Sequence, residues 1–343
     1  MPIEVKSFDD IEAVAADAGG ALDRAAQRHL HDRLEWFRLA EAYRPSQGRA
    51  RIWRADDGEG GRAWLFLSVN RGGRAEALAL WYTLAFRPVF AGEGDRVALI
   101  AAIARALRDE RIGALSLTPV PEADGTLDLL REGFAAAGWW TRGREETVNW
   151  VADTEDQDFA SYWRARPGQL RSTTARKARA ADLDIAIHRS FDGDAWTAYE
   201  QVYAASWKPA EGSPPFLRAL GRVEGAAGTL RLGIARHEGQ PVAAQLWTVE
   251  NGVATIHKLA YVDAARELSP GTLLSAAMFG AAIDGDHVGL IDYGTGDDGY
   301  KADWMDRARP LYRFTAFDLR RPRGLLAFCQ TALHALVARL RAG

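Results

Sequence analysis

The sequence predicts an α/β protein with mixed (α+β) sheets, built from two tandem units and a C-terminal helix. Short runs rich in Val, Ile, Leu, Phe and Trp alternate with longer helical patterns. The order of these elements is the same in both halves, although no residue-level repeat is visible. With 343 residues, the chain is long enough for two ordinary domains with cores of their own.

The first half begins with helical patterning, because 31–43 carries apolar residues on one broad stripe. Turn signals such as DDGEGG and NRGG then separate extended runs. Strands are expected at 50–56, 62–69, 75–86, 114–120 and 146–152, and helices at 97–110 and 126–138. Trp36, Trp81 and Trp247 lie in apolar segments, which predicts that they belong to the core.

The second half repeats the order of three strands, helix, strand, short helix and strand. Strands are expected at 183–190, 229–239, 240–252, 253–262, 288–294 and 310–319, and helices at 194–207, 269–285 and 299–305. An acidic stretch at 151–158 indicates a domain boundary. We therefore expect domains at 1–152 and 153–320, followed by a basic amphipathic helix at 321–343.

Composition excludes several classes of protein. The net charge of −3 argues against DNA binding, and one cysteine, Cys329, excludes a disulfide framework or a cysteine-rich metal site. The start of the chain lacks the pattern of a signal peptide, and no uncharged apolar run approaches the ~18 residues of a membrane span. We expect a cytoplasmic protein that uses no metal.

Two segments are locally basic. Residues 163–181 contain six Lys or Arg and no acidic residue, which is typical of a solvated helix face or of an anion-binding cluster. No acidic residue follows Asp318, and three arginines precede an apolar stripe in the last helix. That helix either docks on the core or lies on a membrane surface.

One candidate binding motif lies at 254–278, where a strand, a short loop and a helix follow one another. Ser269 and Pro270 are favourable at the start of a helix, and Gly271 allows a ligand to approach the backbone closely. The unpaired N–H groups of a first helical turn suit a diphosphate, and Arg266 precedes them.

The stretch IDYGTGDDGYKADW, at 291–304, has the glycine spacing of a phosphate-binding loop. Tyr300, however, occupies the place of the lysine, and Ala302 the place of the magnesium-binding hydroxyl. A nucleoside triphosphatase is therefore excluded. An ordinary turn from strand to helix is the simplest interpretation of these residues alone.

The stretches HKLAYVDAARELSPGTLL, GLIDYGTGDDGYKADW and RFTAFDL together resemble the GNAT acyltransferase superfamily. They are similar to its double-domain bacterial branch, the cellulose-biosynthesis-type acetyltransferases, which are related to the Fem aminoacyl transferases. The resemblance implies two tandem GNAT-like domains, a degenerate first one on the acceptor side and a catalytic second one. The family's Q/R-x-x-G-x-G/A pattern begins here at Arg266, but its first glycine is replaced by Ser269.

The resemblance implies roles for single residues. Tyr300 would protonate the departing thiolate, and Lys301 would bind an anionic part of a substrate. The donor, acetyl-CoA or a longer acyl-CoA, would be held by Leu259, Tyr261, Arg266, Ser269, Gly271 and Thr272. Arg171 and Arg176 would bind the other substrate.

Two residues are candidates for the general base. Alternation along a strand places His257 on the face of Leu259 and Tyr261. Asp292 lies at the end of a strand, where α/β sites usually occur. A buried histidine and a turn-capping aspartate are the alternatives, and a water-relayed base needs neither.

The predicted function is acyl-CoA-dependent N-acylation of an amine, with the acceptor in a cleft between the domains. The acceptor is a small molecule or a lipid amine, such as an envelope sugar or a sphingoid base, with peripheral contact at the inner face of the membrane. One alternative is a Fem-type transferase that takes an aminoacyl group from tRNA to a peptidoglycan precursor. Another is a non-catalytic GNAT-like protein bound at a membrane surface.

Overall fold

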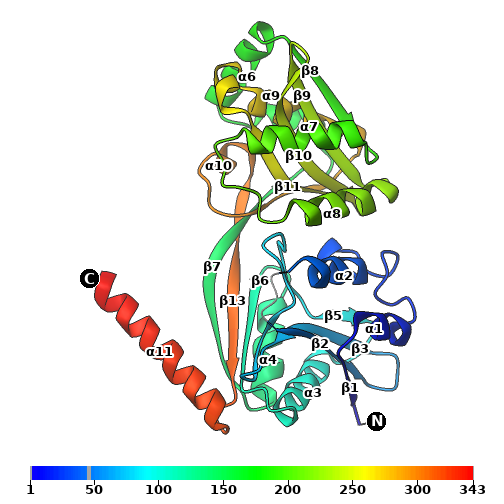
Figure 1. Ribbon diagram of the computed structural model, residues 1–343, viewed down its shortest axis with the longest axis vertical. Coiled ribbons are helices and arrows are strands. Elements are labelled where there is room, and N and C mark those ends of the chain that lie inside the picture. The colour runs from blue at the N-terminus through cyan, green and yellow to red at the C-terminus, as the bar shows by residue number, and fades with distance from the viewer. Residues whose placement is uncertain (1, 45–47, 343) are drawn as a thin grey trace. The chain divides into compact units, whose positions relative to one another are not determined.

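The computed structural model describes residues 2–44 and 48–342, with side chains up to residue 333. The chain forms two compact units (Figure 1). Unit 1 comprises Met1–Thr147 and Arg309–Gly343, and unit 2 comprises Val148–Ala308. These limits differ from the expected boundary after residue 320, because the last strand pairs with a strand of unit 1.

Unit 1 contains a mixed sheet with strand order β1-β2-β3-β4-β6-β13-β7, to which β7 (Trp140–Asp153) contributes its first half, and β5 pairs with β3. Its strands are β1 (Glu4–Phe8), β2 (Arg49–Asp56), β3 (Arg62–Val69), β4 (Arg74–Ala77), β5 (Val89–Ala91), β6 (Ala114–Pro121) and β13 (Arg307–Phe317). Its helices are α1 (Ile11–Ala18), η1 (Leu30–Asp32), α2 (Leu34–Tyr43), α3 (Arg96–Asp109), α4 (Thr126–Ala136) and α11 (Pro322–Ala342).

Unit 2 contains a mixed sheet with strand order β7-β12-β11-β10-β9-β8. Its strands are the second half of β7 (Trp140–Asp153), β8 (Leu183–His188), β9 (Leu230–His237), β10 (Gln240–Glu250), β11 (Val253–Tyr261) and β12 (Leu290–Thr295). Its helices are α5 (Phe159–Arg164), α6 (Gly168–Ala180), α7 (Gly193–Ala204), α8 (Pro214–Ala226), η2 (Asp263–Leu268), α9 (Pro270–Gly280), η3 (Ala281–Gly285) and α10 (Lys301–Trp304).

The two sheets share one topological feature. In each, a single parallel pair, β4 with β6 in unit 1 and β11 with β12 in unit 2, is joined by a helical crossover through α3 or α9. The other pairings whose register is described are antiparallel. The predicted α/β class with mixed sheets, and the repeated order of elements, are therefore confirmed.

In unit 1, the loop that follows β4 packs against β6, the partner of β4 in the parallel pair. β4 ends at Ala77, whereas a strand was expected over 75–86. The following loop buries Tyr82 and Phe86, and the Phe86 N–H donates to the Pro119 carbonyl at 2.7 Å. The prediction that Trp81 lies in the core was wrong, because this loop leaves it 86% exposed; Trp36 and Trp247 are buried as predicted.

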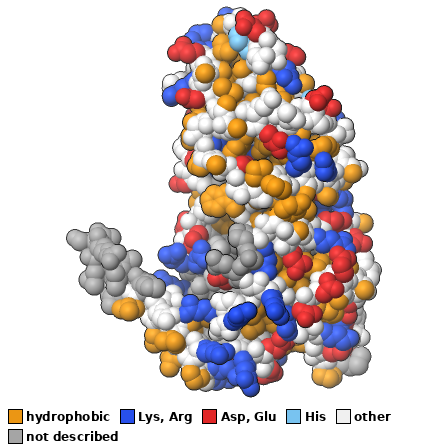
Figure 2. Space-filling view, in the orientation of Figure 1, with side chains coloured by type: hydrophobic (Ala, Val, Ile, Leu, Met, Phe, Trp, Pro, Cys, Tyr) orange, Lys and Arg blue, Asp and Glu red, His pale blue; other side chains and the backbone are white. Residues whose placement is uncertain are grey.

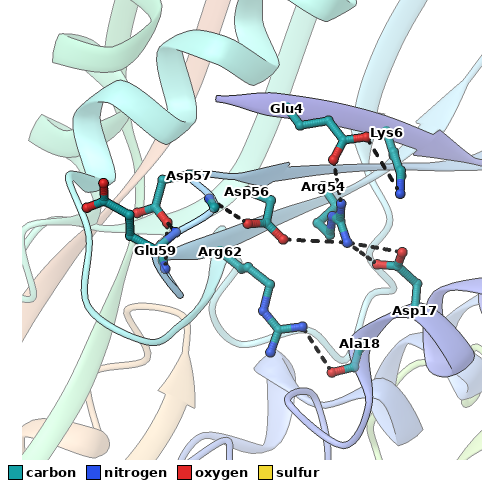
Figure 3. Close-up of polar contacts among 11 residues, drawn as sticks. Glu4, Lys6, Asp17, Ala18, Arg54, Asp56, Asp57, Glu59 and Arg62 are labelled. Carbon is teal, nitrogen blue, oxygen red and sulfur yellow. Dashed lines mark hydrogen bonds and ion pairs between the residues drawn. The ribbon is translucent and has the colours of Figure 1, made fainter. Parts of the chain in front are cut away.

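The N-terminus of unit 1 differs from the helical expectation, because β1 pairs with β2 at the edge of the sheet. Arg54 of β2 stabilises this edge and is itself almost fully buried (Figure 3). Its guanidinium is 2.8 Å from the Asp17 carboxylate, 3.7 Å from that of Asp56 and 3.8 Å from that of Glu4. One cation thus ties β1 and α1 to β2.

The core of unit 2 is aromatic where α9 packs on the sheet. Trp247 of β10 meets Phe279 of α9 edge to face, with ring centroids 5.3 Å apart. Phe279 also packs on Trp304 at 4.9 Å and on Tyr162 at 5.4 Å. The Tyr162 hydroxyl and the Arg166 guanidinium both donate to the Trp304 carbonyl. These contacts fix α10, and with it the residue that precedes it, Tyr300.

The second turn of helix α11 packs against other parts of unit 1. Ala327 and Phe328 pack against Phe317, Ala114 and Trp140. At 100° per residue, the apolar stripe of this helix lies on its other side. The stripe residues with described side chains are all exposed: Leu325, Leu326, Cys329 and Leu333.

The rest of the predicted stripe, Leu336, Val337 and Leu340, lies outside the described side chains. Several Lys and Arg side chains gather around the start of α11 (Figure 2). Within the described residues, no helix has the length and apolar character needed to cross a bilayer.

Candidate active site

Unit 2 contains a pocket of about 410 Å³ beside the ends of β11 and β12. Its walls are mostly aromatic and aliphatic, with a few hydroxyl groups and two charged side chains. It is lined by Leu170, Trp207, Leu259, Tyr261, Arg266, Ser269, Pro270, Gly271, Thr272, Ser275, Tyr293, Tyr300, Asp303 and Trp304. All these residues belong to unit 2, so that unit alone forms the pocket.

The pocket exists because two parallel strands diverge. β11 pairs with β12 only from Val253 to Thr255, although β11 continues to Tyr261 and β12 to Thr295. Beyond Thr255, none of the strands in the described chain pairs with β11 on its β12 side. An extended ligand between the two strands would find backbone N–H and C=O groups along this edge.

The start of α9 forms one wall of the pocket. Ser269 is the N-cap residue of α9, as expected, but it has a left-handed backbone conformation, with φ 54° and ψ 44°, and its hydroxyl makes no capping hydrogen bond. A Cβ added at Gly271 would lie 3.1 Å from the Tyr261 ring, so glycine permits this close packing. Arg266 is exposed at the rim, and no hydrogen bond or ion pair of its guanidinium is found among the described residues.

Tyr300 also lines the pocket and is 40% exposed. Its ring meets that of Tyr293 edge to face, with centroids 5.9 Å apart and an interplanar angle of 70°. Burial raises the pKa of Tyr300, and the neighbouring Asp298 carboxylate raises it further. The nearby Tyr293 hydroxyl acts on this pKa in the opposite direction. The phenol is therefore protonated at neutral pH and can act as a proton donor.

Asp292 and Lys301 support the turn that carries Tyr300, and neither lines the pocket. The Asp292 carboxylate accepts from the Asn149 amide at 2.5 Å and from the Gly294 N–H at 2.7 Å. The second contact is the turn cap that the sequence left open as the alternative to a base.

Lys301 is 4% exposed, and its ammonium is held within its own loop. Its Nζ donates to the Thr295 carbonyl at 2.6 Å and to the Gly296 carbonyl at 3.1 Å, and lies 3.4 Å from an Asp298 carboxylate oxygen. Burial lowers the pKa of this ammonium, partly offset by Asp298. Lys301 therefore stabilises its own loop, whereas the sequence predicted that it contacts a substrate.

His257 lies outside the pocket lining because of an irregularity in the sheet. Lys258 pairs with Leu246 and Ile256 with Trp247, so His257 is the extra residue of a β-bulge. Its Nε2 lies 2.9 Å from the Thr248 hydroxyl, on the face opposite Trp247. The expected shared face with Leu259 and Tyr261 is therefore wrong.

Burial, with a smaller effect of the Lys258 charge, lowers the pKa of His257 to about 4. A group with this pKa is a weak base at neutral pH.

The basic segment forms α5 and α6. Some of its charged side chains contact other parts of unit 2, and others are exposed to solvent. Arg166 is buried and pairs with Asp306, and Lys177 donates to the Glu267 carbonyl. Arg171 and Arg176 are exposed on α6 and do not line the pocket.

The structure thus brings the six expected donor residues and Tyr300 to one pocket. Five other predicted site residues do not line it: His257, Asp292, Lys301, Arg171 and Arg176.

Comparison with known proteins assigns this part of the chain to a family. Residues 163–302 match the family described as acetyltransferase (GNAT) domain. This segment includes η2, the start of α9 and Tyr300. Residues 163–302 are a GNAT domain. The predicted resemblance to the GNAT superfamily is confirmed.

Solved structures extend the comparison to most of the chain. FemX is 11% identical, with a TM-score of 0.64 over 87% of this chain and 94% of that one. A tandem GNAT protein from the clavulanic acid biosynthesis pathway is 14% identical, with a TM-score of 0.50 over 91% and 98%. These likenesses show the fold alone, and they match the predicted tandem arrangement. No curated protein matches the chain.

A third similar structure is a C-terminal domain from Agrobacterium fabrum, named as part of a lysylphosphatidylglycerol synthetase. It is 14% identical, with a TM-score of 0.53 over 79% of this chain and 85% of that one.

Several lining residues of the GNAT domain were not predicted from the sequence. Tyr293 and Ser275 form its buried floor, and Trp207, 59% exposed, lies at its rim. One signal was available for the floor: Gln245 is a polar residue inside the otherwise apolar strand QPVAAQLW. A buried amide needs polar partners, which points to hydroxyl groups on the helix above it.

Proposed function

We propose that the protein is an acyl-CoA-dependent N-acyltransferase that transfers an acyl group to an amine. The observation that carries the proposal is the pocket at the diverging strands of the GNAT domain, which collects Arg266, the start of α9 and Tyr300. A thioester lying between β11 and β12 would be within a pocket that is lined by the Tyr300 phenol and lies beside the unpaired edge of β11.

The residues at the rim and wall suit the donor. Arg266 offers a guanidinium without a protein partner among the described residues, and the Ser269 hydroxyl is not used as a cap. Both fit a diphosphate, which prefers charge-assisted and short polar contacts. The aromatic and aliphatic wall, including Leu259 and Tyr261, fits the apolar parts of a pantetheine arm.

The proposed acyl transfer uses Tyr300, the backbone edge of β11 and water. The neutral amine attacks the thioester carbonyl carbon, a C–N bond forms, and the oxyanion accepts a hydrogen bond from a backbone N–H of the unpaired β11 edge. The C–S bond then breaks, and Tyr300 gives its proton to the departing thiolate. The amine nitrogen loses its extra proton to water, and the phenolate of Tyr300 recovers one. The products are an amide and free coenzyme A.

The acceptor we favour is an amine at a membrane surface, such as an envelope lipid or sugar. The support is α11, whose exposed leucines lie on the side of the helix opposite Ala327 and Phe328, next to a region rich in arginine. Exposed apolar residues beside basic ones are typical of helices that lie in the interface of anionic bilayers. This contact would place the enzyme at the inner face of the membrane.

A second candidate is a Fem-type transferase that uses aminoacyl-tRNA. Its support is the fold shared with FemX and the exposed arginines Arg171 and Arg176 on α6. A polyanion would bind these side chains in a salt-dependent way. In that case the double variant Arg171→Gln, Arg176→Gln would lose binding to tRNA, while the same variant would leave acyl-CoA binding unchanged.

The test is a direct assay of transfer. Acetyl-CoA and longer acyl-CoA esters are incubated with long-chain, sugar and soluble amines, and both free thiol and product mass are measured. We expect thiol release that depends on the amine, and an amine that has exchanged one hydrogen for one acyl group. Transfer from aminoacyl-tRNA but from none of the acyl-CoA esters would favour the second candidate instead.

A further inference from the structure

The pocket lining contains two charged side chains of opposite sign, Arg266 and Asp303. The proposed function gives Arg266 a role at the diphosphate of the donor. It gives none to Asp303, because a carboxylate repels a diphosphate. A carboxylate in this lining fits instead a group that brings N–H donors or a positive charge.

Asp303 lies one helical turn after Tyr300. Its backbone N–H donates to the Tyr300 carbonyl at 3.2 Å, and Tyr300 has a helical backbone conformation, with φ −66° and ψ −21°. Side chains three residues apart on a helix are neighbours on the same face. Both residues line the pocket. The carboxylate is therefore a neighbour of the phenol that we propose as the proton donor.

Buried contacts hold this turn in place. The residue after Asp303 is Trp304, which is 5% exposed. Its carbonyl accepts from the Tyr162 hydroxyl at 2.5 Å and from the Arg166 guanidinium at 2.8 Å. Both donors are themselves buried. The backbone that carries Asp303 is thus fixed at the pocket, which is what a binding residue requires.

Asp303 differs from the other acidic residues of this stretch, 292–306. Each of the others forms a hydrogen bond or an ion pair within unit 2: Asp292, Asp297, Asp298 and Asp306. For Asp303, no hydrogen bond or ion pair of the carboxylate is found among the described residues, and the residue is exposed. The carboxylate is therefore open to a ligand in the pocket.

We propose that Asp303 binds the protonated amine of the acceptor and holds its nitrogen near the thioester, beside Tyr300. The inference deepens the proposed function and rests on it, because that function supplies the donor. A primary alkyl amine is protonated at neutral pH, as the side chain of lysine is. Its ammonium offers three N–H donors and a charge opposite to that of the carboxylate.

The carboxylate acts at two stages of the transfer. It first holds the ammonium, which gives one proton to water so that the nitrogen can attack. When the C–N bond forms, the nitrogen becomes cationic again, and a carboxylate beside it stabilises this charge. The nitrogen then gives a second proton to water. The amide product is neutral, so the ion pair with Asp303 no longer retains it.

The inference predicts a preference among acceptors. The lining is otherwise mostly apolar, so an alkyl chain with an ammonium at one end fits both parts of it. An alcohol with the same chain lacks the charge. Asp303 should therefore select amines over alcohols of equal length, which is a difference that the apolar walls alone cannot make.

The test uses octylamine and 1-octanol as probes, with the full chain at pH 7. Binding is measured by ligand-observed NMR titration, which needs no turnover. We expect the wild type to bind octylamine roughly 10- to 100-fold more tightly than 1-octanol, as for a hydrogen bond between charged groups. In Asp303→Asn, which has nearly the same shape and no charge, this preference should disappear. Asp303→Glu keeps the charge and should retain part of the preference.

Steady-state assays with acetyl-CoA and octylamine provide a second readout. We expect kcat/KM for the amine to fall roughly 10- to 100-fold in Asp303→Asn, with the Kd for acetyl-CoA within a few-fold of the wild type. Asp297→Asn is the matched control, because Asp297 is an exposed acid of the same loop that does not line the pocket. It should behave as the wild type in both experiments.

Equal affinity of the wild type and Asp303→Asn for octylamine would overturn the inference. A weaker Kd for acetyl-CoA with unchanged binding of octylamine would also overturn it, because the carboxylate would then contact the donor. A wild type that binds octylamine through Asp303 but transfers no acyl group contradicts only the proposed function.

Discussion

Replacing Lys301 with methionine distinguishes a structural lysine from a substrate-binding one. Methionine has a similar length and apolar stem but cannot donate a hydrogen bond. The variant removes the contacts of Nζ with the carbonyls of Thr295 and Gly296, and leaves both acceptors without this donor. It also removes the ion pair with Asp298, whose side chain is 58% exposed.

The magnitude follows from these contacts. A hydrogen bond from a charged donor contributes ~1.5–3 kcal/mol, and the desolvation of the buried ammonium, visible in its lowered pKa, reduces the total. The exposed ion pair adds at most ~1 kcal/mol. We expect the free energy of unfolding of unit 2 to fall by about 2–4 kcal/mol. This corresponds to a decrease in Tm of roughly 5–15 °C in differential scanning calorimetry.

Asp298→Asn is the matched control, because it removes the ion pair and leaves both carbonyl contacts in place. Its Tm should decrease by no more than a few degrees, since an exposed pair contributes ~0.2–1 kcal/mol. A Lys301→Met variant that melts like the wild type, but whose KM for a substrate rises many-fold, would refute the structural role and restore the substrate contact expected from the sequence.

Three further predictions address the acid, the histidine and the last helix. Tyr300→Phe should lower turnover by roughly 10²–10⁴-fold and leave the Kd for acyl-CoA nearly unchanged; full turnover in steady-state assays would remove Tyr300 from the mechanism. His257 has a pKa of about 4 when folded and 6.5 when unfolded, so the unfolded chain binds more protons between these values. The free energy of unfolding of unit 2 should therefore decrease by about 2–4 kcal/mol as the pH falls from 6.5 to 4. In chemical denaturation, the free energy of unfolding of His257→Gln should depend less steeply on pH. In cosedimentation, the full chain should bind anionic vesicles in a salt-sensitive way. The variant Leu325→Gln, Leu333→Gln should bind less, although it keeps the contacts of Phe328. If the full chain does not bind at low salt, the result contradicts a membrane role for α11.

The sequence predicted the repeated topology and half of the residues that line the pocket, because both depend on local signals. The Ser-Pro-Gly helix start and the spacing to Tyr300 are contiguous patterns, and the pocket forms where the strands beside them end. His257 was misplaced because a β-bulge depends on cross-strand register, which a single strand does not encode.

Lys301 was misassigned for a related reason. Its carbonyl partners become acceptors only when glycines with positive φ, Gly294 at 65° and Gly296 at 105°, fold the loop back on itself. The strand expected over 75–86 has suitable composition, but the tertiary contact of Phe86 with Pro119 keeps most of it in a loop.

Calorimetric titration of acetyl-CoA into the full chain tests the central claim, that the pocket of the GNAT domain binds an acyl-CoA donor. We expect saturable binding at one site, weakened roughly 10- to 100-fold by Gly271→Asp, which adds a negative charge at the start of α9. Gly271→Ala is the control for the added Cβ near Tyr261 and should bind within a few-fold of the wild type. Absence of binding to the wild type, or equal affinity of the wild type and Gly271→Asp, would contradict the claim.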